Sequence, residues 1–264
     1  MICGHDPRDS TSASLDASGI DTEIDRPVEG LVIGVPREAR AAGNHAGVVA
    51  AVDRAIDVLK SCGAKVVEID LPNAGLAIAA YYLIATAEAS SNLARFDGVR
   101  YGHRAALKTG EGLDALYCRS RAEGFGREVR KRIMLGTHAL SSGYYDAYYG
   151  RALKVRRLIK QDYDAAFRQG CHVVLMPASP GPAFTIGSKT ADPLAMYLED
   201  AFTVGVNMAG LPGITVPAGF ANEGGRELPV GVQLIGPALS ENLLLRAAAM
   251  VERGAGAAER RPQD

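Results

Sequence analysis

The sequence predicts an α/β protein in which a mixed β-sheet is flanked by helices. Short apolar runs rich in β-branched residues occur at Leu31–Pro36, Lys65–Pro72 and within Val173–Gly181. A stretch with helical apolar spacing, Val48–Leu59, separates the first two runs, which is typical of a parallel strand–helix–strand unit. Two later apolar runs flank the polar segment 222–227, as antiparallel strands flank a hairpin turn. Parallel and antiparallel pairs together predict a mixed sheet.

Three segments are expected along the chain. Residues 1–29 are polar and end in a stretch broken by Pro27 and Gly30, so we expect a connecting arm. Residues 30–253 carry the predicted strands and helices and are expected to form one partial domain. Residues 254–264 are expected to be a disordered tail.

The segment between residues 75 and 167 is predicted to be helical. A stretch from about Gly75 to Phe96 is rich in Ala, Ile, Leu and Tyr, and its small residues permit close packing. After a loop over 97–112, two helices are predicted at roughly 124–140 and 146–167. The exposed side of the last helix is basic, with Arg151, Lys154, Arg156, Arg157 and Lys160. A solvated helix face, contact with nucleic-acid phosphates and contact with a partner protein all agree with this pattern.

Asp200 is predicted to lie at a joint between two short helices. Asp192 and Pro193 have the sequence of a helix start, as N-cap and first helical residue. This helix is expected to end near Glu199, where Asp200 leaves the helical register. A second helix is expected over about 203–209.

The chain after the second helix is predicted to turn into the sheet. Gly210 is expected to end that helix, and the pair Pro212 and Gly213 to force a turn before the strand Ile214–Phe220. Ser240 is expected to cap a last helix that runs to about residue 253.

Composition limits the class of protein. The formal net charge is −1, so no long-range field favours nucleic-acid binding by the whole surface. No apolar run approaches the roughly 18 residues of a membrane helix. The four cysteines are scattered and the five histidines show no metal-ligand spacing, so we expect reduced thiols, a cytoplasmic location and no metal site. The loop 37–47 lacks a phosphate-binding glycine pattern.

Two motifs carry a resemblance to a known family. PLAMYLEDAFTVGVNMAGLPGITVPAG (Pro193–Gly219) and PVGVQLIGP (Pro229–Pro237) resemble the C-terminal half of the amidase signature family. Two further segments, Tyr81–Arg104 and Lys131–Ile159, resemble one branch of it, the A subunits of Glu-tRNA(Gln)/Asp-tRNA(Asn) amidotransferases. The resemblance covers nearly the whole chain and implies the C-terminal part of the amidase signature fold.

The resemblance implies an activity and its partners. In that branch, glutamine is hydrolysed through a seryl acyl-enzyme, and the ammonia amidates a mischarged tRNA. A tRNA-binding B subunit uses ATP and Mg for this step, and a small C subunit completes the complex. No cofactor is expected in this chain, its contact with tRNA is expected to be indirect, and no membrane is involved.

One departure from the family concerns catalysis. The family needs a lysine and two serines, the serines lying in a glycine-rich loop, and no such loop occurs in these residues. The lysine accepts a proton through one serine and so activates the other as nucleophile. We therefore expect no catalytic residue in this chain, and no activity from the chain alone. The expected status is a fragment or one half of a two-chain enzyme.

Three residues match the positions that hold free glutamine in the family: Tyr82, Arg132 and Asp200. A zwitterionic amino acid needs an anion for its ammonium group and a bidentate cation for its carboxylate, which Asp200 and Arg132 offer. Each has an alternative role. Arg132 belongs to a charged helix face, Asp200 is placed to cap the following helix, and the adjacent Tyr81 competes with Tyr82 for the same assignment.

Two other functions remain open at this point. One is a fragment of a stand-alone amidase that acts on another carboxamide. The other is a non-catalytic scaffold that binds the partners of the complex.

Overall fold

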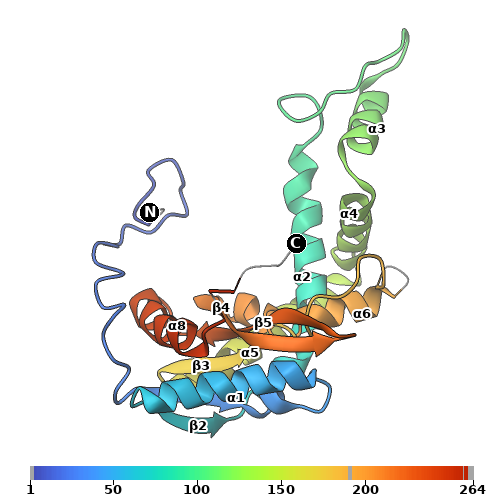
Figure 1. Cartoon of the computed structure of the whole chain (residues 1–264). Helices are drawn as coiled ribbons and strands as arrows, with labels where there is room; N and C mark the ends of the chain where they lie inside the picture. Colours follow the sequence, from blue (N-terminus) through green and yellow to red (C-terminus); the bar gives the residue numbers. More distant parts are fainter. Residues whose placement is uncertain (1–2, 190–191, 258, 261–264) are drawn as a thin grey trace. The chain divides into compact units, whose positions relative to one another are not determined.

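The computed structural model describes residues 3–189, 192–257 and 259–260 and divides into two compact units. The sheet unit comprises residues 1–74 and 159–264, and the helical unit comprises residues 75–158. Figure 1 shows the strands and helices of these units.

The sheet unit contains one five-stranded sheet in the order β2-β1-β3-β5-β4. β1 pairs in parallel with β2 and β3, while β5 pairs antiparallel with β3 and β4. This arrangement confirms the predicted mixed sheet. The strands are β1 (Val32–Pro36), β2 (Lys65–Ile69), β3 (Val173–Pro177), β4 (Gly213–Glu223) and β5 (Arg226–Ile235).

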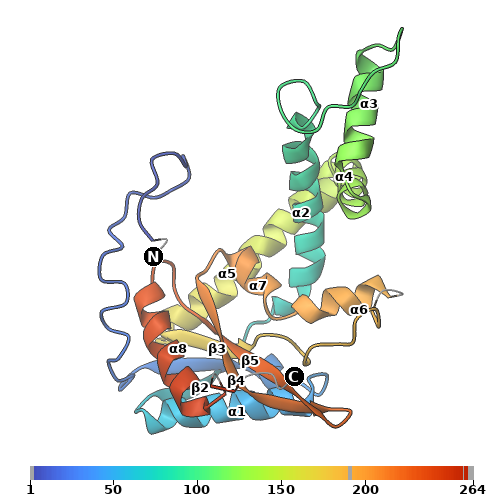
Figure 2. The same ribbon diagram turned by 45° about the horizontal axis from the view of Figure 1, so that its top comes forward.

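Large apolar side chains fill the core of the sheet unit. β3 lies in the centre of the sheet and all five of its residues are buried, as expected for a strand covered on both faces. α1 (Ala46–Ser61) and α8 (Glu241–Ala255) pack against each other and against β4 (Figure 2). The largest fully buried side chains of the described residues all belong to this unit: Ile33, Leu59, Ile159, Leu175, Leu234, Ile235, Val28, Val48, Val52, Val173, Val174 and Val232.

The predicted joint around Asp200 is present. α6 (Pro193–Tyr197) runs into a 3-10 turn, Leu198–Asp200, and α7 (Val204–Ala209) follows. The N-cap prediction for Asp192 is confirmed, because its Oδ1 accepts a hydrogen bond from the Ala195 N–H at 3.2 Å. Gly210 ends α7 with a φ of 64°, which is the left-handed conformation that favours glycine.

Two details differ from the sequence-based predictions. The predicted strand Ile214–Phe220 is present, but β4 runs on to Glu223, within the expected turn, before it forms the predicted hairpin with β5. Ser240 precedes α8 but does not cap it, since its hydroxyl donates to the Pro237 carbonyl at 2.7 Å instead. The serine side chain therefore closes the turn before the helix.

The helical unit is built around two packed helices, α2 (Ala77–Asn92) and α4 (Arg127–Ala139). Gly136 makes the close approach possible: a Cβ at this position would lie 1.9 Å from the Thr86 carbonyl oxygen. The helix crossing therefore depends on a residue without a side chain.

The sequence pattern misses one helix of this unit. α3 (Leu113–Gly124) occupies a segment between the predicted loop and the start of the next predicted helix. Its buried residues are only Leu116 and Ser120, so it lacks the apolar periodicity that marks a helix in a sequence. A π-helix, Tyr145–Gly150, leads into α5 (Arg151–Arg168), where the sequence predicts one continuous helix.

The two units differ in charge. The helical unit has 14 Lys and Arg against 7 Asp and Glu, whereas the sheet unit has 15 against 23. The near-neutral total charge of the chain hides this separation. Across the described ranges, no helix has both the length and the apolarity needed to cross a bilayer.

The segment before β1 and the segment after α8 both contact other parts of the sheet unit. Arg253 donates to Asp25 Oδ1 at 2.5 Å, and Arg246 donates to the Arg26 carbonyl at 3.1 Å. Arg260 donates to Glu227 Oε2 at 2.6 Å and stacks over the Phe220 ring at 3.9 Å. The division into an arm, a domain and a tail stays a prediction, and residues 258 and 261–264 of the expected tail lie outside the described residues.

Candidate functional site

Arg132 lies on the side of α4 that faces α2. It is half-buried and stands four residues before Gly136, which places both on the same face of the helix. Its Nε donates to Glu128 Oε1 at 3.0 Å, and its guanidinium also has a hydrogen bond with Tyr81. The hydrogen bond with Glu128 above all, and then the one with Tyr81, raise the pKa of Arg132 above its usual range against the opposing effect of burial.

The two adjacent tyrosines of α2 lie in contact with each other. The rings of Tyr81 and Tyr82 meet edge to face, with their centroids 5.1 Å apart, and both residues are half-buried. Tyr81 thus contacts Arg132 directly, and the Tyr82 ring contacts the Tyr81 ring. The sequence assigns the position to Tyr82, with Tyr81 as the adjacent alternative, and that assignment stays a prediction. The hydrogen bond with Arg132 belongs to Tyr81.

Asp200 belongs to the sheet unit. It is exposed at the end of the 3-10 turn, and its backbone carbonyl accepts from the Thr203 N–H at 3.1 Å. The start of α7 has no side-chain cap, so the structure does not support the capping role. Within the described part of the chain, the Asp200 carboxylate forms no hydrogen bond or ion pair, which leaves it available to a ligand.

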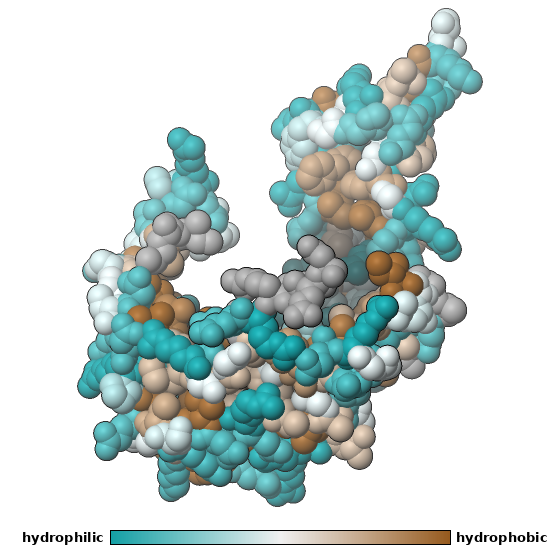
Figure 3. All heavy atoms as spheres, viewed as in Figure 1, coloured by the Kyte–Doolittle hydropathy of each residue, from teal (hydrophilic) through white to brown (hydrophobic). Residues whose placement is uncertain are grey.

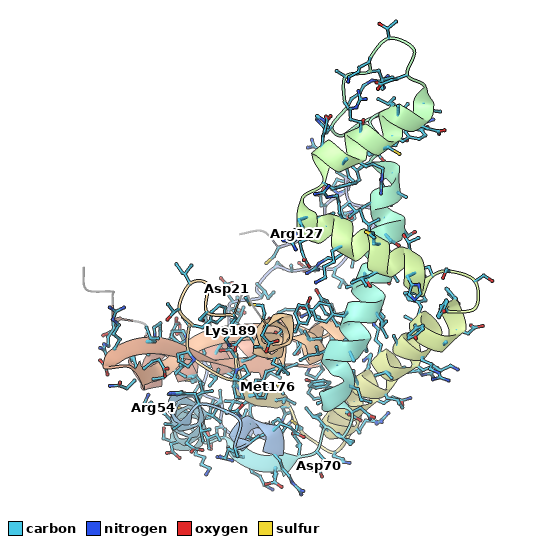
Figure 4. All side chains as sticks on the ribbon, turned by 90° about the vertical axis from the view of Figure 1, so that its right-hand side faces the viewer. Asp21, Arg54, Asp70, Arg127, Met176 and Lys189 are labelled. Carbon is cyan, nitrogen blue, oxygen red and sulfur yellow. The ribbon has the colours of Figure 1, made fainter. Side chains whose placement is uncertain are left out.

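A cavity of about 900 Å³ opens in the sheet unit near this joint. It is lined by the loop that follows β3, by Glu199 next to Asp200, and by residues before α1 and at the tip of the β4–β5 hairpin. Lys189 pairs with Glu199 and lies 4.7 Å from the centroid of the Phe184 ring. Figure 4 labels Lys189 on this loop.

The cavity presents charges of both signs. His45 Nε2 lies 3.3 Å from Glu223 Oε2, while His45 Nδ1 accepts from the Gly47 N–H at 3.0 Å. Arg226 adds a cation to the residues that line the cavity. Sequence reasoning missed this cavity; the available signal was the run of Gly and Pro directly after a buried strand, because loops at strand ends commonly carry binding residues.

Metal ligation receives no support from the side chains. Among the residues that the structure describes, no group of three or more His, Cys, Asp or Glu side chains is arranged to hold a metal ion. The four cysteines are free thiols, and Cys171 is buried.

Comparisons with known proteins agree with the fold. Residues 1–245 match the model of the family described as Amidase. The chain is 52% identical over 260 residues to the A subunit of the Glutamyl-tRNA(Gln) amidotransferase of Cereibacter sphaeroides, covering 98% of this chain and 52% of that protein. It is 50% identical over 256 residues to the protein of the same name from Ruegeria pomeroyi, covering 97% and 51%.

A solved structure gives the same result. The crystal structure of the Glutamyl-tRNA(Gln) amidotransferase A subunit from Thermotoga maritima matches with a TM-score of 0.67 and 36% identity, over 95% of this chain and 47% of that chain. The chain spans about half the length of the curated relatives it matches. The family match over most of the sequence decides the classification: the chain belongs to the amidase family.

Proposed function

We propose that this chain forms the glutamine-binding half of an amidotransferase A subunit, which hydrolyses glutamine to supply ammonia for the amidation of mischarged tRNA. The observation that carries the proposal is identity of 50% or more, over 97–98% of this chain, with relatives named as A subunits of Glutamyl-tRNA(Gln) amidotransferase. Hydrolysis of the side-chain amide of glutamine fits a family described as Amidase.

Arg132, Asp200 and Tyr82 are proposed to bind the glutamine. The planar guanidinium of Arg132 suits the α-carboxylate, and the exposed carboxylate of Asp200 suits the α-ammonium group. Glutamine would compete with Glu128 for the guanidinium, since that carboxylate already accepts from Nε. Tyr81 adds a hydroxyl group that is hydrogen-bonded to Arg132, and the Tyr82 ring lies against the Tyr81 ring.

The chain alone is proposed to be inactive. The serine nucleophile, its bridging serine and the lysine base have no counterpart in these residues, so no acyl-enzyme forms. The B subunit with its ATP and Mg, and the C subunit, are proposed as the partners that use the ammonia. The location proposed for the complex is the cytoplasm.

The first experiment measures glutamate release from glutamine by two proteins. One is the purified chain. The other is a chimera in which this chain replaces the matching half of the Cereibacter sphaeroides protein, supplied with the B and C subunits. We expect no release by the chain alone and release by the chimera. A chimera that hydrolyses simple aliphatic amides faster than glutamine contradicts the proposal in favour of a stand-alone amidase.

The second experiment tests the charged binding residues in the chimera. Arg132→Gln and Asp200→Asn each remove a charge-assisted contact, so we expect kcat/KM for glutamine to fall by about tenfold to a hundredfold. Arg130→Gln is the matched control, because this exposed residue lies two positions away on the same helix and forms no ion pair within the described residues. Equal loss in Arg130→Gln and Arg132→Gln contradicts the assignment.

Variants of Tyr81 and Tyr82 test which of the two hydroxyl groups contacts the substrate. Tyr81→Phe and Tyr82→Phe keep the rings and remove one hydroxyl each. We expect the larger rise in KM from the residue whose hydroxyl contacts the substrate. A KM unchanged in both variants removes the tyrosines from the site.

A further inference from the structure

The helical unit carries an excess of positive charge that the whole-chain charge does not reveal. Its 14 basic residues outnumber its acidic residues two to one, and 11 of the 14 are arginines. Arginine forms paired hydrogen bonds with phosphate and stacks on flat rings, so an arginine-rich surface suits nucleic acid better than a lysine-rich one.

The exposed face of α4 combines cations with apolar side chains. Arg127, Met134 and His138 fall at spacings of seven and four residues, which puts them on one side of the helix. Met134 is 73% exposed, and the neighbouring Leu135 is 51% exposed. The stretch from Arg127 to His138 covers about 16 Å at about 1.5 Å per residue.

A row of aromatic rings continues this face. The His138 ring lies 4.5 Å from the Tyr144 ring, and Tyr144 stacks on Tyr148 with centroids 5.8 Å apart and planes at 27°. Both tyrosines are more than 40% exposed. Exposed rings held in a row are platforms for unpaired bases.

The basic residues at both ends of the row are not neutralised. Arg127 and Arg130 lie at the start of α4, and Arg151, Lys154 and Arg157 lie at the start of α5, directly after the tyrosines. All five are exposed, and none forms an ion pair with any residue that the structure describes. Figure 4 labels Arg127 at the start of α4, and Figure 3 shows hydrophilic and hydrophobic residues interspersed over the helices of this unit.

We propose that this surface, called here the basic aromatic strip, binds a single-stranded stretch of RNA directly. The strip consists of Arg127, Arg130, Met134, His138, Tyr144, Tyr148, Arg151, Lys154 and Arg157. The arginines and the lysine contact phosphates, while the two tyrosines stack on bases. The inference deepens the proposed function by giving its RNA a direct contact on this chain, in place of the indirect contact that the family resemblance implies. It rests on that function only for the source of the RNA.

An acidic protein is the main competitor for the same surface. Positive charge attracts either partner, but stacked exposed tyrosines next to arginine favour bases over carboxylates. A carboxylate-bearing partner offers no flat ring face to Tyr144 and Tyr148. RNA therefore accounts for both the charge and the rings.

The test uses the intact chain and a fluorescently labelled single-stranded RNA of about 20 nucleotides in titrations at several NaCl concentrations. We expect binding that weakens with salt. The triple variant R151Q/K154Q/R157Q removes about three phosphate contacts, so the slope of log K against log salt should fall by about 2. We expect a loss of affinity of about tenfold or more at about 0.1 M NaCl.

A matched control tests whether RNA affinity depends on where the positive charges lie or only on the total charge of the chain. K60Q/K65Q/R168Q removes three exposed basic residues of the sheet unit, which also form no ion pair within the described ranges. We expect RNA affinity to change less than twofold. Equal loss in the two triple variants overturns the proposal. R127Q/R130Q repeats the test at the other end of the strip if the first triple variant fails to fold.

The tyrosines distinguish RNA from other polyanions. Y144A/Y148A should weaken RNA binding by about tenfold or more, since stacking contributes roughly 1–3 kcal/mol per base, and should leave heparin binding unchanged. Equal effects on RNA and heparin, or competition by polyglutamate as strong as that by RNA, overturn the proposal in favour of a generic anion or an acidic protein.

The same variants distinguish this inference from the proposed function. Glutamate release by the chimera should be unchanged in R151Q/K154Q/R157Q, because free glutamine does not contact the strip. Loss of RNA binding with intact glutamate release supports the strip. Glutamate release without any RNA binding overturns the strip and leaves the proposed function standing.

Discussion

The sheet unit and the helical unit are held together in different ways. The sheet unit buries large side chains such as Leu175, Leu234 and Ile235 between its strands and helices. The buried apolar side chains of the helical unit, as far as the structure describes it, are mostly alanines, with Ile84 and Leu116 as the larger ones. Burial of large apolar side chains stabilises the sheet unit. Close packing of the backbones of α2 and α4 at Gly136 stabilises the helical unit. The helical unit therefore leaves exposed on its surface large apolar side chains of the kind that the sheet unit buries.

The largest expected effect tests the first half of this comparison. Leu234→Ala empties a fully buried position in β5 and should lower the free energy of unfolding by about 2–5 kcal/mol. Leu135→Ala, at a half-exposed position of α4, is the control and should cost less than about 0.5 kcal/mol. Urea unfolding measured by circular dichroism gives both values. Similar losses would show that the helical surface is packed in solution.

Gly136→Ala tests the second half. The new Cβ has only 1.9 Å to the Thr86 carbonyl oxygen, and that backbone atom has no rotamer to relieve the clash. We expect a cost of about 1–3 kcal/mol and faster proteolysis within residues 75–158. The control is Gly126→Ala just before α4, where φ is −64° and nothing lies within 4 Å of a new Cβ. Equal susceptibility of both variants contradicts the close-packing account.

Alkaline pH should weaken the sheet unit in a defined window. Burial raises the pKa of the Cys171 thiol to about 11 from an ordinary value of 9.0. The contribution of this neutral thiol is complete below about pH 9 and is lost as pH rises towards 11, because the unfolded chain gives up its proton first. We expect a loss of about 1 kcal/mol between about pH 8 and pH 10.

The control for the pH effect is Cys171→Ala. This variant has a lower stability at both pH values but should lose less between them than the parent. Burial raises the pKa of Tyr163 in the same direction, so a smaller decline remains in the variant. An identical decline in the two proteins removes Cys171 as its source.

Surface ion pairs should contribute least in both units. Glu68→Gln breaks a contact with Arg37 of 2.6 Å in the sheet unit, and Glu128→Gln breaks the contact with Arg132 in the helical unit. The first pair is largely exposed, and the second joins the half-buried Arg132 to an exposed Glu128 at i,i+4 on the surface of α4, so each change should cost less than about 0.5 kcal/mol. Thermal melts of each variant and the parent at about 0.05 and 0.5 M NaCl measure the loss of stability and how far salt reduces it. A larger cost for Glu128→Gln would show that orientation of Arg132 matters to the packing of the unit.

Most of the sheet unit was predictable because its elements carry strong local signals. β1, α1 and β2 follow from β-branched runs around a periodic helix, and Gly210 ends α7 in the left-handed conformation that its residue type favours. The order of the strands was not predictable from local patterns. The pairing of β3 with both β1 and β5 depends on contacts between residues far apart in the sequence.

The helical unit was predicted less completely. α3 has few buried residues, and the π-helix at Tyr145–Gly150 uses the same residue types as an α-helix. For the candidate site, the family resemblance pointed to Tyr82, Arg132 and Asp200, while the contact between Tyr81 and Arg132 required the packing of α2 on α4. The opposite charges of the two units were not predictable, because the boundary between the units follows contacts between residues far apart in the sequence.

The π-helix before α5 separates the length of the chain from the direction of its side chains. A π-helix closes hydrogen bonds over one residue more than an α-helix does, so it holds an additional residue in about the same axial rise. Deleting Ala147 would let the segment relax to α-helix with one residue fewer and would leave the part before it in about the same orientation relative to α5. A one-residue insertion or deletion in this turn is therefore absorbed locally, and Tyr144 keeps about the same direction relative to the basic start of α5.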